Sequence, residues 1–90
     1  MEPVEINAGS WYLRARCTDE WAADTAYSWA VCDPTTGAVL AEVTLNPRCA
    51  TLTSRTRHGH EDAAAAACES VRRFAAATLG LLQLVAQSGQ

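Results

Sequence analysis

The residues whose types could do chemistry are concentrated in residues 55–62, which read RTRHGHED. A glycine-containing turn that opens a helix directs unpaired backbone N–H groups outward, and such turns bind phosphate and carboxylate groups. The basic side chains of this segment would add further hydrogen-bond donors around the turn. The candidate binding residues are therefore Arg55, Arg57, His58, Gly59 and His60.

The same segment offers a metal site as an alternative. His58 and His60 are two positions apart, and imidazoles with this spacing can converge on one ion together with the carboxylates that follow them. The spacing places no fourth ligand, because Cys49, the one nearby candidate, belongs to the preceding predicted strand. We therefore expect no metal, and a solvated loop capped by acidic residues is the favoured interpretation.

No catalytic residue is indicated elsewhere in the chain. The four cysteines, at positions 17, 32, 49 and 68, include no C-x-x-C pair, and we expect reduced thiols that act as small buried hydrophobes. Cys68 falls on the apolar face of the predicted long helix, which favours a core residue over a nucleophile. Glu42 is better explained as a solvent-facing strand residue than as a general base.

Length and charge narrow the possible classes of protein. The 90 residues form one domain, residues 1–90, with a thin core. Seven basic residues, all of them arginine, and ten acidic residues give a net charge of −3, which argues against a surface for nucleic acid or an anionic membrane. No stretch approaches the roughly 18 apolar residues of a membrane span. Because the acidic start MEPVEIN does not resemble a secretory signal, we expect a cytoplasmic protein.

Alternation of apolar and polar residues predicts the strands that would carry the loop. The segments are residues 11–17, 27–33, 38–45, 49–54 and 81–86, with a short helix at 18–24 that Thr18 would cap. The sequence DPTTG at 33–37 predicts a hairpin turn in which Gly37 adopts a positive φ.

One long helix is predicted from Glu61 to the residues before Gly80, which would end it in a left-handed conformation. Its apolar residues follow the three- and four-residue spacing of one buried face. They are Ala64, Ala67, Cys68, Val71, Phe74, Ala75, Thr78 and Leu79. The predicted fold class is therefore α+β, a mainly antiparallel sheet of about five strands with one long helix on one face.

A single helix leaves the other face of the sheet uncovered, and monomers rarely expose a large apolar patch. Tyr27 and Trp29 share one side of their strand, and Trp11 lies on the same side of its strand as Leu13. Trp11, Tyr27 and Trp29 are therefore the candidate interface residues. We therefore expect a homodimer or an association with a larger protein partner.

Three segments resemble the GNAT N-acetyltransferase superfamily, in particular its ribosomal-protein-alanine N-acetyltransferase-like branch. INAGSWYLRA resembles the first strand of that branch, and SWAVCDPTTGAVLAEVTL resembles its second and third strands. RTRHGHEDAAAAACESVRRFAAATLGLLQLV resembles the acetyl-CoA loop, its helix and the entry to the fifth strand. Together they cover about two thirds of the chain. The resemblance implies a truncated GNAT-like core with acetyl-CoA as the candidate cofactor.

The chain departs from that pattern around the expected site. The paired N-terminal helices are reduced to residues 18–24, and the helix that normally carries a tyrosine acid and the final two strands have no counterpart. In the loop pattern Q/R-x-x-G-x-G/A, anchored on Gly59, the basic position falls on Thr56 and the last small position on Glu61. The Glu61 carboxylate, with Asp62 beside it, would repel a pyrophosphate by an energy on the order of several kcal/mol.

Two functions remain open on these residues. In the favoured one, the chain is a truncated GNAT-like domain that is not catalytic by itself and acts through homodimerisation or association with a partner protein. In the alternative, it is a small acetyl-CoA-dependent N-acetyltransferase whose site is completed across a dimer. The absent segments and the acidic loop favour the first function, whereas the preserved helix and Arg55, Arg57 and Gly59 favour the second.

Overall fold

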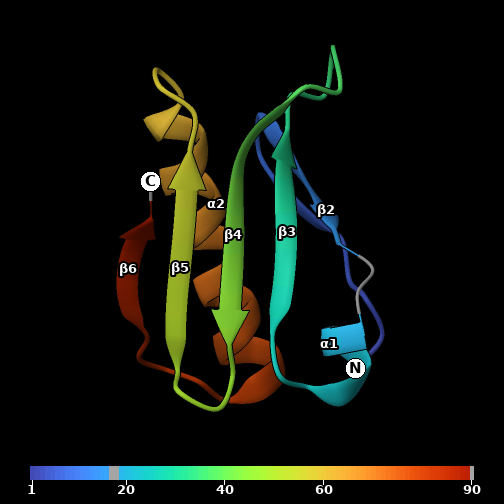
Figure 1. Cartoon of the computed structure of the whole chain (residues 1–90), viewed down its shortest axis with the longest axis vertical. Coiled ribbons are helices and arrows are strands. Elements are labelled where there is room, and N and C mark those ends of the chain that lie inside the picture. The colour runs from blue at the N-terminus through green and yellow to red at the C-terminus, as the bar shows by residue number, and fades with distance from the viewer. Residues whose placement is uncertain (17–18, 90) are drawn as a thin grey trace.

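Six strands form one sheet whose spatial order follows the order of the chain, and a long helix packs against one face (Figure 1). The computed structural model describes residues 1–16 and 19–89. Its elements are β1 (Ile6–Ala8), β2 (Trp11–Ala15), α1 (Asp19–Ala23), β3 (Tyr27–Cys32), β4 (Val39–Asn46), β5 (Thr51–Thr56), α2 (Glu61–Phe74), a π-helical continuation (Ala75–Leu79) and β6 (Val85–Gly89). The predicted α+β class, with a mainly antiparallel sheet and one long helix, is confirmed.

The sheet is antiparallel from β1 to β5, and β6 pairs parallel to β5. Helix α2 makes the crossover that a parallel pair requires. In the centre of the sheet Trp29 of β3 lies opposite Val43 of β4, and Val43 lies opposite Ser54 of β5. These three residues therefore share the face that α2 covers.

The element boundaries differ most from the predicted ones in three places. The structure adds β1, whose three residues are too few for alternation to reveal. Strand β5 begins at Thr51 because the Asn46 side chain closes a turn, accepting hydrogen bonds from the backbone N–H groups of Arg48 (3.0 Å) and Cys49 (3.2 Å). Strand β6 begins at residue 85 instead of 81. The predicted Thr18 cap and Cys17 lie outside the described residues.

The hairpin between β3 and β4 forms as predicted. The Asp33 carboxylate accepts a hydrogen bond from the Thr35 N–H at 2.7 Å, and the Gly37 N–H donates to the Asp33 carbonyl at 2.8 Å. Gly37 has a φ of 75°, a conformation that other residues adopt only with strain. This turn fixes the register of β3 and β4, and therefore decides which side chains share a face.

Aromatic packing between the sheet and the helices forms the centre of the core. The fully buried ring of Trp29 meets Trp21 of α1 at a centroid distance of 5.2 Å and Phe74 of α2 at 5.6 Å, both edge-on. Its indole N–H donates to the Val4 carbonyl at 2.6 Å, so the polar atom of the ring is satisfied. The N-terminal segment, α1 and α2 are thereby held on the same side of β3.

The predicted buried face of α2 is confirmed over most of its length. Ala64, Ala67, Val71 and Ala75 are all buried against the sheet. Thr78, the exception, is exposed. It lies in the π-helical continuation, where the wider turn rotates side chains away from the face that a regular helix would present.

The expectation that Tyr27 and Trp29 form an interface is wrong. Both side chains lie on the α2 face and are buried in the chain's own core, with exposed fractions of 2% and 0%. Trp11 is half-buried at the start of β2. Alternation along a strand separates the two faces of a sheet but does not say which of them a helix covers. The uncovered face carries polar side chains in place of the aromatic ones.

Truncation of Trp29 should therefore unfold the domain and not dissociate a dimer. We expect Trp29→Ala to lower the free energy of unfolding by about 3–5 kcal/mol, because a large cavity opens and the Val4 carbonyl loses its donor. Urea titration followed by circular dichroism measures the change. The control is Leu82→Ala, whose side chain is 83% exposed and which should change stability by less than about 0.5 kcal/mol. Equal effects in the two variants would contradict the core assignment.

Tyr27 also forms a titratable contact at the end of α1. Its hydroxyl donates to the Asp24 carboxylate at 2.7 Å, and burial, followed by this hydrogen bond, raises the pKa of Tyr27 to about 12. The same carboxylate accepts a hydrogen bond from the Met1 ammonium at 2.6 Å. That bond, with the one from Tyr27, lowers the pKa of Asp24.

We expect the free energy of unfolding to fall between pH 10 and 12, because the folded state holds Tyr27 as the neutral phenol. This contribution is complete below the ordinary pKa of 10 and is lost as the pH rises towards 12. Denaturant titrations at steps across this range should show a smaller decline for Tyr27→Phe than for the wild type. An identical decline would assign the pH dependence to another group.

Candidate functional site

The loop predicted to bind an anion connects β5 to α2 at one end of the sheet (Figure 1). It begins where the Arg57 N–H donates to the Leu40 carbonyl of β4 at 3.0 Å. The turn closes when the His60 N–H donates to the Arg57 carbonyl at 3.0 Å, with Gly59 at a φ of 89°. Glycine is needed at this position because other residues are strained there.

The helix start that follows the loop offers little to an anion. His60 occupies the N-cap position without a side-chain hydrogen bond to the helix, and His58, Gly59 and His60 are all exposed. Glu61 and Asp62 occupy the first turn, where carboxylates favour the positive helix end. The negative charge that would suit this helix end is therefore already supplied by the chain.

The backbones of β5 and β6 are paired up to the residues next to the loop. Backbone pairing of β5 with β6 continues to Arg55 opposite Gly89, one residue before β5 ends. A ligand that approached the loop would meet a closed sheet edge and not a gap between the two parallel strands. Among the described residues, the loop therefore presents separate exposed donors at positions 57–60.

The metal alternative gains no support from the arrangement of the side chains. Within residues 1–16 and 19–89, no three side chains of the His, Cys, Asp and Glu types come together in a group that could hold an ion. Cys49 precedes β5 and His58 follows it, so this six-residue strand separates them by about 20 Å.

The cysteines behave only partly as expected. Cys32 is buried and Cys68 is half-buried, whereas Cys49 is exposed in the turn before β5, contrary to the prediction of a buried thiol. Burial raises the pKa of the Cys68 thiol, which makes it a poor nucleophile. Cys17 lies outside the described residues.

The five predicted binding residues do not form one site. Arg55 and Arg57 lie on the side of the sheet away from α2, where they line a hollow of about 210 Å³ with Glu42 of β4. His58, Gly59 and His60 lie at the exposed tip of the loop. The two arginines therefore belong with the strand residues beside them and not with the helix start.

The sheet face turned away from α2 is the candidate functional surface, here called the open face. Strand alternation and register assign to it Tyr12, Arg14, Arg16, Ser28, Ala30, Cys32, Val39, Glu42, Thr44, Thr53, Arg55 and Arg57, and the Glu5 carboxylate joins it at the Tyr12 hydroxyl. Small side chains lie in its middle, at Ser28, Ala30, Thr44 and Thr53, and longer ones flank them. The face is therefore a shallow, polar surface across four strands.

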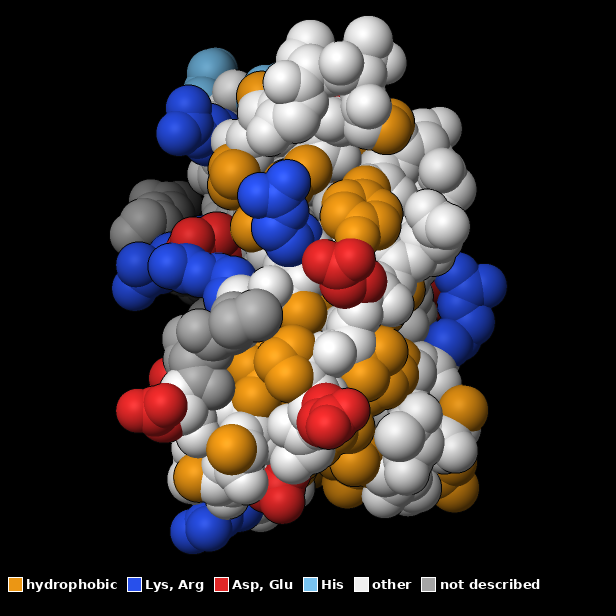
Figure 2. Space-filling model, turned by 90° about the vertical axis from the view of Figure 1, so that its right-hand side faces the viewer, with side chains coloured by type: hydrophobic (Ala, Val, Ile, Leu, Met, Phe, Trp, Pro, Cys, Tyr) orange, Lys and Arg blue, Asp and Glu red, His pale blue; other side chains and the backbone are white. Residues whose placement is uncertain are grey.

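Positive charge is concentrated on the open face. It holds four of the seven arginines and two of the ten acidic residues, Glu42 and the Glu5 that bonds to Tyr12, a formal charge of +2, and the remainder of the chain carries −5. Figure 2, in which this face is turned to the left, shows basic side chains on the upper part of that side, with acidic ones beside and below them. The net charge of −3 conceals this separation, and exclusion of anionic partners on net charge alone does not apply to this face.

Glu42 pairs with a distant arginine and not with its direct neighbour. Arg55 is its cross-strand partner on β5, but the Glu42 carboxylate forms its ion pair with Arg16 beyond β3. The small side chains of Ala30 and Ser28 leave room for this reach across β3. Within residues 1–16 and 19–85, no carboxylate forms an ion pair with Arg14, Arg55 or Arg57.

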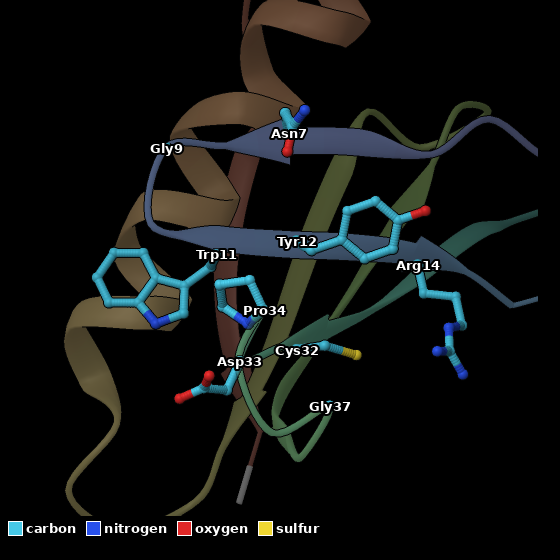
Figure 3. A pocket seen from close by; sticks show the side chains of 9 residues that line it. All are labelled: Asn7, Gly9, Trp11, Tyr12, Arg14, Cys32, Asp33, Pro34 and Gly37. Carbon is cyan, nitrogen blue, oxygen red and sulfur yellow. The ribbon is translucent and has the colours of Figure 1, made fainter.

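A second hollow lies beside the open face, next to the turn between β3 and β4. It has a volume of about 360 Å³, and Figure 3 shows Trp11 and Arg14 at its two ends with Asp33, Pro34 and Cys32 between them. The Asp33 carboxylate is held by the backbone of its own turn. The Arg14 guanidinium is therefore the charged group of this hollow without a partner in the described chain.

Sequence reasoning missed the open face as a functional surface. The alternation in WYLRARC does put Arg14 and Arg16 on one side of β2, and this was the available signal. The register that brings Arg14, Glu42 and Arg55 into one row depends on three strand pairs and cannot be read from local pattern.

No protein-family model, curated protein or solved structure matches this chain. In the described ranges, none of the helices has the length and apolar character needed to cross a bilayer. The side chains that the fold exposes are therefore the basis for inferring a function.

Proposed function

We propose that the domain is an association module, not catalytic by itself, whose open face binds a partner protein. The observation that carries this proposal is an uncovered sheet face on which Arg14, Arg55 and Arg57 have no carboxylate partner in the described residues. Arginine is enriched in protein interfaces, and complementary charge speeds and directs association. The shallow floor of small side chains suits a protein surface better than a small molecule.

A homodimer through this face is disfavoured by its own charge. A symmetric dimer would bring identical faces together, and each carries +2. Like charges held close across an interface oppose association. Of the two partner classes expected from the sequence, a different protein with an acidic surface is therefore the better supported.

An acetyl-CoA-dependent N-acetyltransferase is the alternative function. It is supported by the order β5, loop, α2, β6 with its parallel strand pair, and by Arg55 and Arg57 beside the loop. It is opposed by the carboxylates of Glu61 and Asp62 at the helix start and by the continuous pairing of β5 with β6. Both features stand where the diphosphate and the arm of the coenzyme would have to bind.

Site-specific photo-cross-linking in the cells that naturally produce the protein tests the proposed function. A benzoylphenylalanine at Thr44, on the open face, should cross-link the chain to another protein, whereas the same group at Ala65, exposed on α2, should not. Thr44 and Ala65 lie on opposite sides of the sheet, so the second position controls for random collisions. A cross-link from Thr44 to a second copy of the chain would show that the open face forms a homodimer and does not bind a different protein. No cross-link from either position would overturn the proposal.

Calorimetric titration with acetyl-CoA tests the alternative. We expect no binding by the wild type at millimolar coenzyme, because Glu61 and Asp62 repel the pyrophosphate. Glu61→Gly should then gain measurable affinity if that charge is the main obstacle, with Glu61→Gln as the control that removes the charge without adding glycine. Micromolar binding by the wild type would contradict the association module and favour the acetyltransferase.

A further inference from the structure

One row of cross-strand neighbours on the open face has an ordered sequence of charges. Arg14 of β2, Ala30 of β3, Glu42 of β4 and Arg55 of β5 are consecutive partners in the sheet register. Adjacent strands lie about 4.8 Å apart, so Arg14 and Arg55 are separated by about 14 Å. The Glu42 carboxylate, the one negative group in this row, lies between them.

This spacing matches an extended polypeptide laid across the strands. Alternate residues of an extended chain point to the same side and recur about every 6.7 Å, so residues i and i+4 are about 13 Å apart on one face. A chain lying perpendicular to the strands can therefore place two side chains separated by three residues over the two guanidinium groups.

We propose that the occupant of the open face is an extended acidic segment of the partner, in which two carboxylates separated by three residues bind Arg14 and Arg55. The inference rests on the proposed function and deepens it by giving the chemistry of the partner. The side chain midway between the two carboxylates faces Ala30 and Glu42. It is neutral or basic, because a third carboxylate would be repelled by Glu42.

Both ends of the row have features that suit such a segment. Arg57 lies beside Arg55 at the same hollow, so the second carboxylate can meet two guanidinium groups. Arg14 borders the hollow in Figure 3, which has room for the side chain next to the first carboxylate. The Glu5 carboxylate, which accepts a hydrogen bond from the Tyr12 hydroxyl, also lies at this end and would repel any further carboxylate of the segment beyond the first.

A nucleic acid fits the same charges less well. Long polyanions extend beyond a single face, and the remainder of this chain carries −5. Bases also bind by stacking on aromatic side chains, and the single aromatic residue among those of the open face is Tyr12. A short acidic segment spans the positive face alone and avoids the negative surround.

Fluorescence anisotropy with synthetic peptides tests the inference. The probe is a fluorescein-labelled peptide in which two glutamates are separated by three neutral residues. It should bind more tightly than three matched peptides: one with glutamines for the glutamates, one with the glutamates separated by a single residue, and one with a third glutamate at the centre. Binding should weaken as salt is raised, because the contacts are exposed ion pairs.

Matched variants of the chain connect the binding to the row. Arg14→Gln and Arg55→Gln should each lower the affinity for the probe peptide by about 1.5- to 5-fold, the range expected for the loss of one exposed ion pair. Arg73→Gln, on the exposed side of α2, is the control and should leave the affinity unchanged. Circular dichroism of each variant verifies the fold. Equal affinity for the glutamine peptide, or equal weakening by Arg73→Gln, would overturn the inference.

Three further outcomes distinguish this inference from the proposed function. If an oligonucleotide binds as tightly as the peptide and depends on the same arginines, the ligand of the open face is a nucleic acid and not an acidic polypeptide. Failure of the peptide to bind, with the Thr44 cross-link to a partner retained, would overturn the acidic segment and leave the association module standing. Failure of both would overturn both.

Discussion

The burial of Trp29 decides which side of the sheet becomes the core. Its ring contacts Trp21 and Phe74, and its N–H finds the Val4 carbonyl, so β3 has one favourable orientation towards α2. A slip of one residue would carry all the core side chains of the strand to the other face. The pairing of β2, β4 and β5 around β3 follows the same choice, and the open face consists of the residues that alternate with the core ones.

Helix stability and anion binding compete at the start of α2. Glu61 and Asp62 favour the helix because they lie at its positive end. The same carboxylates repel any phosphate that would use that end. Arg14 and Arg55, by contrast, lie on strands, where they carry no such conflict and are exposed to solvent. The open face is therefore net positive, whereas the first turns of α1 and α2 carry acidic residues.

Local signals in the sequence predicted the elements better than they predicted their faces. The DPTTG turn, the apolar face from Ala64 to Ala75 and the left-handed Gly80 all depend on neighbours in the chain, and each is present. Tyr27 and Trp29 were placed on the wrong face because alternation is symmetric until a helix packs against one side. The loop residues separated for a related reason: Arg55 and Arg57 follow the strand pleat, whereas His58 to His60 follow the turn.

The charge pattern of the open face depends on the small residues of β3. If Glu42 paired with Arg55, its direct neighbour, the β4–β5 end of the row would be neutral and only Arg14 would remain. Ala30 and Ser28 leave space above β3, and the Glu42 carboxylate instead reaches Arg16. Larger side chains at these two positions would block that reach and favour the Glu42–Arg55 pair. The sizes of Ala30 and Ser28 therefore determine which arginines remain unpaired and available to a partner. The Glu42 carboxylate, which lies between Arg14 and Arg55, determines which charge the central side chain of the bound segment can have.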